Sequence, residues 1–439
     1  MMESPALPAV RPGLGGDFSI WIMKSALRPL QVFLIAPPLL FLAMLTAMLL
    51  RHQNVDFYEI DRVAFCVLVI ALVGRVMVLR QRLLVVERIT WPMLALSALT
   101  VGAVVRQPFN TETWSLLATK FLVPFALFNL AGLIYTEERR FRQFEIYSLV
   151  VLAYLSFTAI AFLVGARSLI FPRFILDESL GFHADRARGP FLQAVANGVS
   201  LNILGLVALH AYRRGSSRGA KVALLLASLP VAILATMTRA VWLSFAATVV
   251  ALVLLSGKHA ARRALAVLVL VAGAGLVIVS SHELREALSE RLEERGPVDF
   301  RAAVYAGSWQ MFLERPLLGW GFHQMPAELP RYVSEYKDKI LYPHNTYLEI
   351  LVESGLVGLV FYVWLMWEMF RLSRGAIPAA EHDSFLNQEF HRLWPIILAV
   401  YWVNAGLVVM SYQFVNAVLF TMAGMLAAQR RRAQRELPC

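Results

Sequence analysis

A histidine stands at the boundary between a polar segment and an apolar run near the carboxyl end of the sequence. His344 follows Pro343 and precedes Asn345, and the apolar run begins at Thr346. The pKa of a histidine lies near neutrality, so a neutral imidazole there can accept a proton from a hydroxyl group. The alternative interpretation is a histidine that caps the helix or lies at a membrane surface. The stretch therefore predicts a general base at the edge of an apolar helix.

Four arginines combine a fixed positive charge with a position close to the end of an apolar run. The guanidinium group is planar, stays charged and can bind phosphate oxygens through two parallel hydrogen bonds. Several of them together would suit a phosphate or pyrophosphate carried by a lipid, whereas snorkelling or an ion pair would explain any single one. Arg239 is the strongest candidate, because it lies in a short turn between two apolar runs. The four are Arg186, Arg188, Arg239 and Arg301.

Asn197 and the absence of several known motifs limit the reactions that we expect of this protein. Asn197 lies at the start of an apolar run, where its amide would bind a sugar or phosphate or join one helix to another. The sequence contains no Asp-x-Asp pair and no glycine-rich phosphate loop with a lysine, so we expect no metal, no cofactor and no nucleotide-sugar donor. No basic-aromatic nucleic-acid module is visible, and nucleic acid is not an expected partner.

The elements that must position these residues are membrane helices. Of the 439 residues, 58% are hydrophobic and only 16% are charged, which excludes an ordinary soluble globule. Lipid offers no hydrogen-bond partner to the backbone, and the apolar runs do not alternate, so helices are expected rather than a barrel. The predicted fold class is an all-α, polytopic integral membrane protein surrounded by membrane lipids.

About twelve apolar runs are long enough to cross a bilayer as helices. Residues 1–280 should hold nine of them, residues 281–345 one long periplasmic loop, and residues 346–439 three more with a basic cytoplasmic tail. The loop should contain a charged helix over 281–295 and an amphipathic one over 300–313. The runs are 32–50, 62–79, 91–105, 113–135, 146–165, 190–212, 221–236, 240–256, 264–280, 346–370, 393–410 and 413–428.

The basic residues predict the orientation, because Lys and Arg resist translocation and remain in the cytoplasm. The net charge is +11, and arginines cluster in alternate connections and in the tail at 430–435. Both termini should therefore be cytoplasmic, with His344 and the four arginines on the outer face. No removable signal peptide is visible at the amino terminus, so we expect the first span to direct insertion.

Four short motifs follow one another along the sequence: Arg188-Gly189-Pro190-Phe191 with Asn197; Thr238-Arg239-Ala240-Val241-Trp242; Arg301 with Pro316-Leu317-Leu318-Gly319-Trp320-Gly321; and His344-Asn345 with Gly355-Leu356-Val357-Gly358. In this order they resemble the O-antigen ligase and polymerase superfamily, whose histidine motif is His-Asn, nine residues and Gly-x-x-Gly. Thr238 stands where that family often has Ser, Ala194 and Ala196 depart from its Asn-Pro-Asn, and Arg186 matches no motif.

The resemblance implies a glycosyltransferase of the bacterial inner membrane with a periplasmic active site. Such proteins transfer a glycan from undecaprenyl pyrophosphate to an acceptor without metal or nucleotide. His344 would activate the acceptor hydroxyl and Arg239 would assist in catalysis, and we expect inversion at the anomeric centre. The substrate-binding residues would be Arg188, Arg301, Arg186, Asn197 and Asn345.

The acceptor distinguishes the members of the superfamily. A ligase uses a sugar hydroxyl of lipid A-core in lipopolysaccharide synthesis, a polymerase uses another lipid-linked glycan, and a protein O-oligosaccharyltransferase uses Ser or Thr. One dominant outer loop and a short region after the histidine motif favour the ligase. A transporter of lipid-linked glycan is the alternative from another class, and it predicts inverted repeats and helix breaks within the membrane, which the apolar pattern does not indicate.

Overall fold

The computed structural model describes residues 37–50, 60–79, 87–181, 183–215, 219–255, 286, 289, 296–333, 341–375, 377 and 384–436. Every regular element within these ranges is a helix, so the all-α prediction is confirmed there. The apolar run 264–280 and nearly all of the expected charged helix 281–295 lie outside the described residues. The total of about twelve spans therefore stays a prediction.

The other expected spans coincide with helices over most of their length. Four helical stretches are long and apolar enough to cross a membrane: Thr111–Ile134, Glu138–Leu163, Ala194–Arg213 and Thr346–Arg374. The main helices are α2 (Pro37–Leu49), α3 (Ile60–Leu79), α4 (Thr90–Val105), α5 (Thr111–Leu117), η1 (Ala118–Leu122), α6 (Val123–Ile134), α7 (Glu138–Leu163), α8 (Ala194–Arg213), α9 (Gly219–Leu234), α10 (Arg239–Leu254), α13 (Gly296–Glu314), α14 (Met325–Glu328), α15 (Thr346–Arg371), α16 (Gln388–Ala405) and α17 (Gln413–Glu436).

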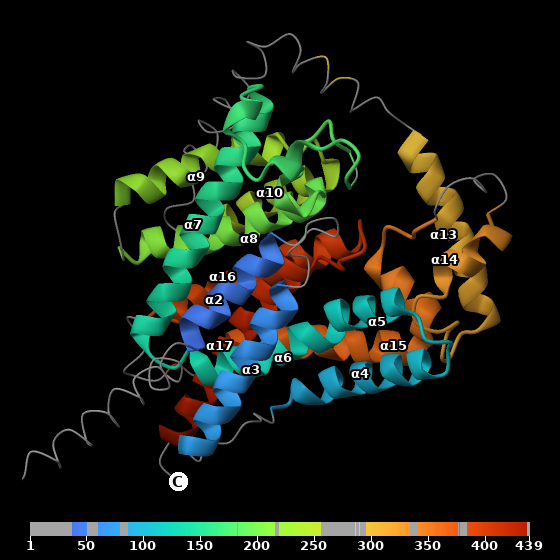
Figure 1. Cartoon of the computed structure of the whole chain (residues 1–439), viewed down its shortest axis with the longest axis horizontal. Helices are drawn as coiled ribbons and strands as arrows, with labels where there is room; N and C mark the ends of the chain where they lie inside the picture. Colours follow the sequence, from blue (N-terminus) through green and yellow to red (C-terminus); the bar gives the residue numbers. More distant parts are fainter. Residues whose placement is uncertain are drawn as a thin grey trace, which may run out of the picture.

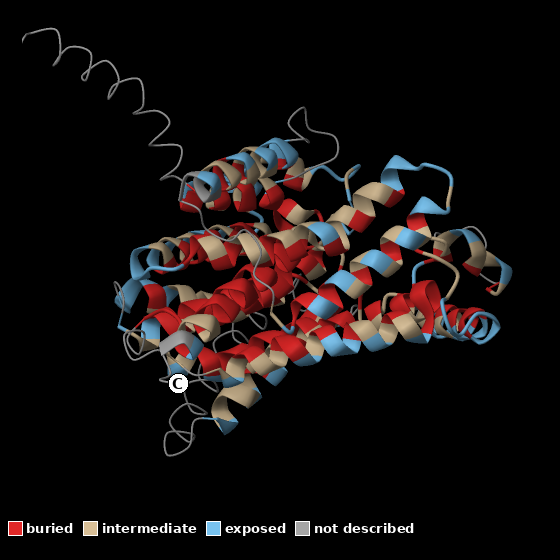
Figure 2. Cartoon of the chain, turned by 90° about the horizontal axis from the view of Figure 1, so that it is seen from below, coloured by how far each residue is buried: buried red, intermediate tan, exposed pale blue. Residues whose placement is uncertain are grey.

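Helices α8, α16 and α17 form the centre of the described structure (Figure 1). On one side lie α7, α9 and α10, and on the other lie α4, α5 and α15 with α13 and α14 at the end (Figure 1). Buried residues concentrate on the central helices, whereas the outer helices expose one face (Figure 2). The exposed faces of the outer helices are apolar at many positions, as lipid contact requires.

Glycines allow the central helices to approach their neighbours closely. A Cβ atom on Gly198 of α8 would lie 2.3 Å from Val241 of α10, and one on Gly205 would lie 2.5 Å from Leu229 of α9. Close approach increases van der Waals contact, which is the main source of helix association in a membrane. The sequence of α8 thus fixes both α9 and α10, and with them the position of Arg239 at the start of α10.

Ion pairs join three helices at the end where α7 begins. Arg214, which follows α8, donates to Glu138 at 2.7 Å and to Glu145, both on α7. Arg213 at the end of α8 pairs with Glu389 on α16. These contacts hold the basic ends of α7, α8 and α16 together at the face that charge predicts to be cytoplasmic.

The segment expected as an amphipathic helix over 300–313 lies within α13, so its helical character is confirmed. α13 packs against α15 and, with α14, builds a second small core that includes Val304, Met311, Leu329 and Val352. Figure 1 shows α13 and α14 beside the end of α15 that carries its first residues. The region between 296 and 333 is therefore anchored to α15.

Helix α15 is broken, whereas the apolar pattern predicts a continuous span over 346–370. Gly355 has φ 64° and ψ −165°, which is not helical. The segment 316–321 fills the break through four backbone hydrogen bonds. The amides of Trp320 and Gly321 donate to Val352 and Glu353 at 2.9 Å, and the amides of Leu356 and Val357 donate to Pro316 and Leu317 at 2.8 and 3.2 Å.

The glycines of both motifs explain why the segment fits into the break. A Cβ on Gly355 would lie 2.2 Å from the carbonyl oxygen of Leu317, and one on Gly319 would lie 2.5 Å from the carbonyl of Glu353. Gly319 and Gly355 therefore allow one backbone to lie directly against the other. The backbone groups freed by the break are satisfied by segment 316–321, as a buried helix break requires.

Replacing Gly355 by Ala should destabilise the protein strongly. The φ of 64° with a ψ of −165° is a conformation open almost only to glycine and costs an L-residue about 1–3 kcal/mol, and the clash with Leu317 adds to it. We expect the free energy of unfolding to fall by more than about 2 kcal/mol, with a lower Tm, measured by intrinsic tryptophan fluorescence on heating the purified protein in detergent.

Gly102→Ala is the matched control for this substitution. Gly102 lies within α4, and a Cβ there would meet nothing within 4 Å. The Tm of this variant should stay the same or rise slightly, because Ala favours a helix more than Gly does. Equal Tm values for the two variants would contradict the role of the break.

Candidate functional site

His344 lies immediately before α15 in a constrained backbone. Its φ of 46° is left-handed, which is uncommon for a residue with a side chain and is frequent at functional sites. Pro343 before it is buried, and Asn345 after it is the N-cap of α15. The side-chain oxygen of Asn345 accepts from the amides of Tyr347 and Leu348 at 3.0 and 3.1 Å. The local sequence thus holds the imidazole at the amino end of α15.

The surroundings of His344 favour the neutral imidazole. Its ring lies 6.4 Å from the ring of Phe300, centroid to centroid. Partial burial lowers the pKa of His344 below the ordinary value of a histidine, and the positive charge of Arg301 and the proximity of His183 lower it further. A neutral ring can accept a proton at neutral pH, which is the property required of a general base.

Arg301 is the arginine that the structure brings to His344. It lies on α13, half-buried, close enough for its charge to lower the pKa of His344. The hydroxyl of Tyr305, one turn further along α13, lies 3.5 Å from the carbonyl oxygen of His344 as a donor. Tyr305 therefore lies within hydrogen-bond distance of the backbone of His344, and Arg301 lowers the pKa of its imidazole.

Arg188 is fully buried and holds a loop together. Its Nε donates to the carbonyl of Ile175 at 3.1 Å, and its two terminal nitrogens donate to the carbonyls of Leu180 and Asp177. Burial lowers the pKa of Arg188, although nearby carboxylates oppose this effect, and an arginine stays charged all the same. Three of its five donors are engaged in this loop, and its expected contact with substrate stays a prediction.

Asn197 is also fully buried and serves the same loop. Its amide nitrogen donates to the carbonyl of Ala187 at 2.8 Å, and the amide of Ala187 donates to the carbonyl of Ala235 at 3.0 Å. The loop 183–191 is thereby fixed to the start of α8 and to the turn that precedes Arg239. The residue stabilises the loop in the structure, and its expected hydrogen bond to substrate stays a prediction.

The hydrogen bond between the amide of Ala187 and the carbonyl of Ala235 joins two segments, one of which carries Arg186 and the other Arg239. Arg239 is the first residue of α10 and is half-buried, and Arg186 is 6% exposed with its Nε 3.4 Å from a carboxylate oxygen of Asp185. His183 of the same loop lies near enough to His344 to affect its pKa. The loop therefore reaches from the Arg239 turn toward His344.

An apolar groove opens beside His344, between α13 and α15. Its volume is about 560 Å³. Asn345 lines one end, and the remainder is aromatic and aliphatic. The lining residues are Tyr305, Ala306, Trp309, Asn345, Tyr347, Leu348, Leu351 and Leu359. Such a groove suits a hydrocarbon chain whose polar end lies near His344 and Arg301.

A buried ion pair lies on the same part of α15. Lys120 Nζ is 2.7 Å from a carboxylate oxygen of Glu349, and the two side chains are only 14% and 10% exposed. One turn further, Glu353 accepts from the backbone amide of His323 at 2.9 Å. Lys120 lies in η1, a π-helical turn, and such turns are frequent at functional sites.

The sequence carries a signal for Lys120, which lies within the apolar run 113–135. A lysine within an apolar run of a membrane protein is costly and is a functional candidate by default. Glu349 lies five residues after His344 in the sequence, but its partner Lys120 lies on a helix far away in the sequence. The ion pair is therefore apparent only in the folded structure.

His, Cys, Asp and Glu side chains of the described residues form no group of three that could hold a metal ion. The expectation of a metal-independent reaction stays a prediction.

Comparison with known protein families gives a match to part of the chain. Residues 222–363 match the family model described as O-antigen ligase. The match includes Arg239, Arg301, His344 and Asn345. This part of the chain therefore matches the family that the motifs predict, and the match supports an activity of the glycosyltransferase type. No curated protein sequence matches the chain.

The pKa of His344 should respond to Arg301. Loss of a neighbouring positive charge stabilises the imidazolium, so Arg301→Gln should raise the pKa of His344. Partial burial remains in the variant and keeps the pKa below that of an exposed histidine. The measurement is the titration of ¹³C-labelled histidine by NMR, with the His344 signal assigned by its absence in a His344→Gln variant.

Arg331→Gln is the control for this titration, since Arg331 is exposed and pairs with Glu328. It should leave the His344 titration unchanged. A pKa of His344 at or above the ordinary histidine value in the wild-type protein would contradict the neutral-imidazole assignment.

The Lys120–Glu349 pair should show strong coupling in stability. Lys120→Met leaves a buried carboxylate without its partner, which costs on the order of 3–5 kcal/mol. Glu349→Gln removes the carboxylate that pairs with Lys120 and should destabilise the protein for the same reason. The double variant Lys120→Met/Glu349→Gln carries neither unpaired charge and should recover most of the stability, measured as Tm in detergent. Additive losses would show that the two charges do not depend on each other.

Proposed function

We propose that this protein is an O-antigen ligase of the bacterial inner membrane. It transfers a glycan from undecaprenyl pyrophosphate to a sugar hydroxyl of lipid A-core on the periplasmic face. The match of residues 222–363 to the O-antigen ligase family supports the reaction class. The observation that carries the proposal is the neutral, half-buried His344 beside Arg301 at the end of an apolar groove.

In the proposed reaction the acceptor oxygen attacks the anomeric carbon of the donor glycan while its proton passes to the imidazole of His344. The bond from the anomeric carbon to the pyrophosphate oxygen breaks, and its electron pair leaves with the pyrophosphate. His344 later releases the proton to water. Attack from the face opposite the leaving group inverts the anomeric configuration. The lowered pKa of His344 supports its role as the proton acceptor.

Arginines would stabilise the negative charge that develops on the pyrophosphate. Arg301 influences His344 electrostatically, so a pyrophosphate bound to it would lie close to the base. Arg239 would contribute from the start of α10. Fixed cations directed at a leaving group lower the barrier without having to reorganise during the reaction.

The remaining expected site residues fit supporting roles in this proposal. Arg188 and Asn197 hold the loop that carries His183 and Arg186, so they would position substrate contacts rather than make them. Asn345 caps α15 through its oxygen, and it also lines the groove. Its amide nitrogen would then be directed to the donor, whose isoprenoid chain would lie along Tyr305 and Trp309.

The experiment is reconstitution of the purified protein with undecaprenyl-pyrophosphate glycan and lipid A-core, without added metal or nucleotide. Glycan transferred to the core is followed by electrophoresis. His344→Ala should lower the transfer rate by about 10²–10⁴-fold, the usual contribution of a general base. Arg239→Ala should lower it by about 10²–10³-fold. Arg331→Gln, an exposed basic residue paired with Glu328, should transfer at the wild-type rate.

The products of the same reaction separate the alternatives. Lengthening of the lipid-linked glycan without transfer to the core would make the protein a polymerase and overturn the ligase. Transfer to Ser or Thr of an added protein acceptor would identify a protein O-oligosaccharyltransferase. Wild-type transfer by His344→Ala would contradict the base assignment, and a wild-type protein with no transfer of either kind would favour the transporter.

A further inference from the structure

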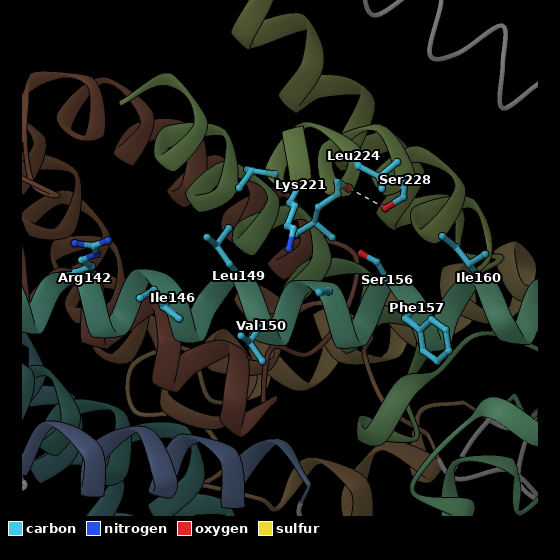
Figure 3. Close-up of a pocket in the computed structure, with 13 residues that line it drawn as sticks. Arg142, Ile146, Leu149, Val150, Ser156, Phe157, Ile160, Lys221, Leu224 and Ser228 are labelled. Carbon is cyan, nitrogen blue, oxygen red and sulfur yellow. Dashed lines mark hydrogen bonds between the residues drawn. The ribbon is translucent and has the colours of Figure 1, made fainter. Parts of the chain in front are cut away.

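A second apolar groove lies between α7 and α9, away from the candidate site. Its volume is about 630 Å³. Thirteen residues line it, and nine of them are aliphatic or aromatic (Figure 3). Its walls include Ile146, Val150, Phe157 and Leu224, which are 49%, 61%, 52% and 73% exposed. Exposed apolar side chains on membrane helices face hydrocarbon, so the groove opens toward lipid.

Two basic residues line the groove. Arg142 of α7 lies at one end, and Lys221 of α9 lies further along, with its amine directed toward α7 near Val150 (Figure 3). Both residues are exposed. From Arg142 to Ile160 the groove follows α7 for about 27 Å at 1.5 Å per residue, close to the ~30 Å thickness of a hydrocarbon core. A chain entering at the basic end would therefore stay within the hydrocarbon layer.

Nearby arginines form ion pairs, whereas Arg142 and Lys221 of the groove form none within the part of the chain that the structure describes. Arg140 pairs with Glu137 at 2.8 Å, and Arg213 and Arg214 pair with glutamates of α16 and α7. Among the described residues, neither Arg142 nor Lys221 has an ion-pair partner. Because both lie beside an apolar surface, a bound group with a negative head and a hydrocarbon tail would satisfy both parts of the groove.

The helix dipoles at this end also favour an anion. α7 begins at Glu138 and α9 at Gly219, so each basic residue lies near the amino end of its own helix, Arg142 on α7 and Lys221 on α9. The amino end of a helix carries a partial positive charge, which attracts phosphate and disfavours a cation. Arg142 and Lys221 therefore add positive charge where the backbone is already positive, and a bound anion would relieve their repulsion.

We propose that the groove between α7 and α9 binds an anionic glycerophospholipid, with its phosphate headgroup at Arg142 and Lys221 and an acyl chain along α7. Basic pockets between membrane helices on the cytoplasmic side are typical sites for such headgroups. The orientation expected from the basic residues places this end of α7 in the cytoplasm. The site is independent of the glycosyltransferase proposal, since it lies at the opposite end of the membrane helices.

The test uses the full-length protein in detergent micelles that contain equal amounts of palmitoyl-oleoyl phosphatidylglycerol and palmitoyl-oleoyl phosphatidylcholine. Native mass spectrometry counts the molecules of each lipid that remain bound. The two lipids share their acyl chains, so their ratio reports recognition of the headgroup. Each basic residue should contribute about fivefold to the preference for phosphatidylglycerol, giving about 25-fold in the wild type. Arg142→Gln and Lys221→Gln should each lower that preference about fivefold.

Arg139→Gln is the matched control, because Arg139 is exposed on the first turn of the same helix but does not line the groove. Its loss should leave the bound-lipid ratio unchanged. Ala153→Trp fills the groove without altering charge and should release the lipid. An equal effect of Arg139→Gln and Arg142→Gln, or no effect of Ala153→Trp, would overturn the proposal.

A photoreactive benzoylphenylalanine at position 153 identifies the occupant directly. Cross-linking to phosphatidylglycerol supports the proposal. Cross-linking to the apolar run 264–280 of the chain would show that the protein covers its own groove, and cross-linking to a polyprenyl phosphate would show a site for the glycan carrier. Either of these results would overturn the proposal.

Discussion

The backbone hydrogen bonds between segment 316–321 and α15 support the arrangement around His344. An unpaired backbone group away from water costs several kcal/mol, so a buried helix can break only where another segment supplies partners. Gly355 and Gly319 lack the Cβ atoms that would keep the two backbones apart. Because segment 316–321 follows α13 directly, its attachment to α15 also fixes α13. Arg301 is thereby held near the histidine.

Charge is arranged differently on the two sides of the amino end of α15. On the side of His344, Arg301 provides positive charge and lowers the pKa of the imidazole. On the other side, Glu349 is neutralised by Lys120, and Glu353 is bound by the amide of His323. Unpaired carboxylates would repel the anionic donor of the proposed reaction. The ion pair with Lys120 compensates the charge of Glu349 and so favours an anion near His344.

Part of this organisation could be predicted from the sequence. The helical class follows from apolar runs in lipid, and the spacing of Arg301 and His344 within known motifs indicated residues that the fold brings close. The roles of Arg188 and Lys120 could not be predicted. A guanidinium binds a carbonyl as readily as a phosphate, and the partner of a buried lysine depends on contacts between helices far apart in the sequence. The break at Gly355 escaped prediction for the same reason, since its partner segment lies before the span.

The pairing of segment 316–321 with the break has a consequence for protein engineering. The two backbone segments donate hydrogen bonds to each other and meet closely at Gly319 and Gly355, so we expect a change in either one to disturb the other. Chimeras that exchange the region between 281 and 345 would separate two halves of one structural unit. The exchangeable module is instead residues 296–363, which carries α13, segment 316–321 and both sides of the break in α15.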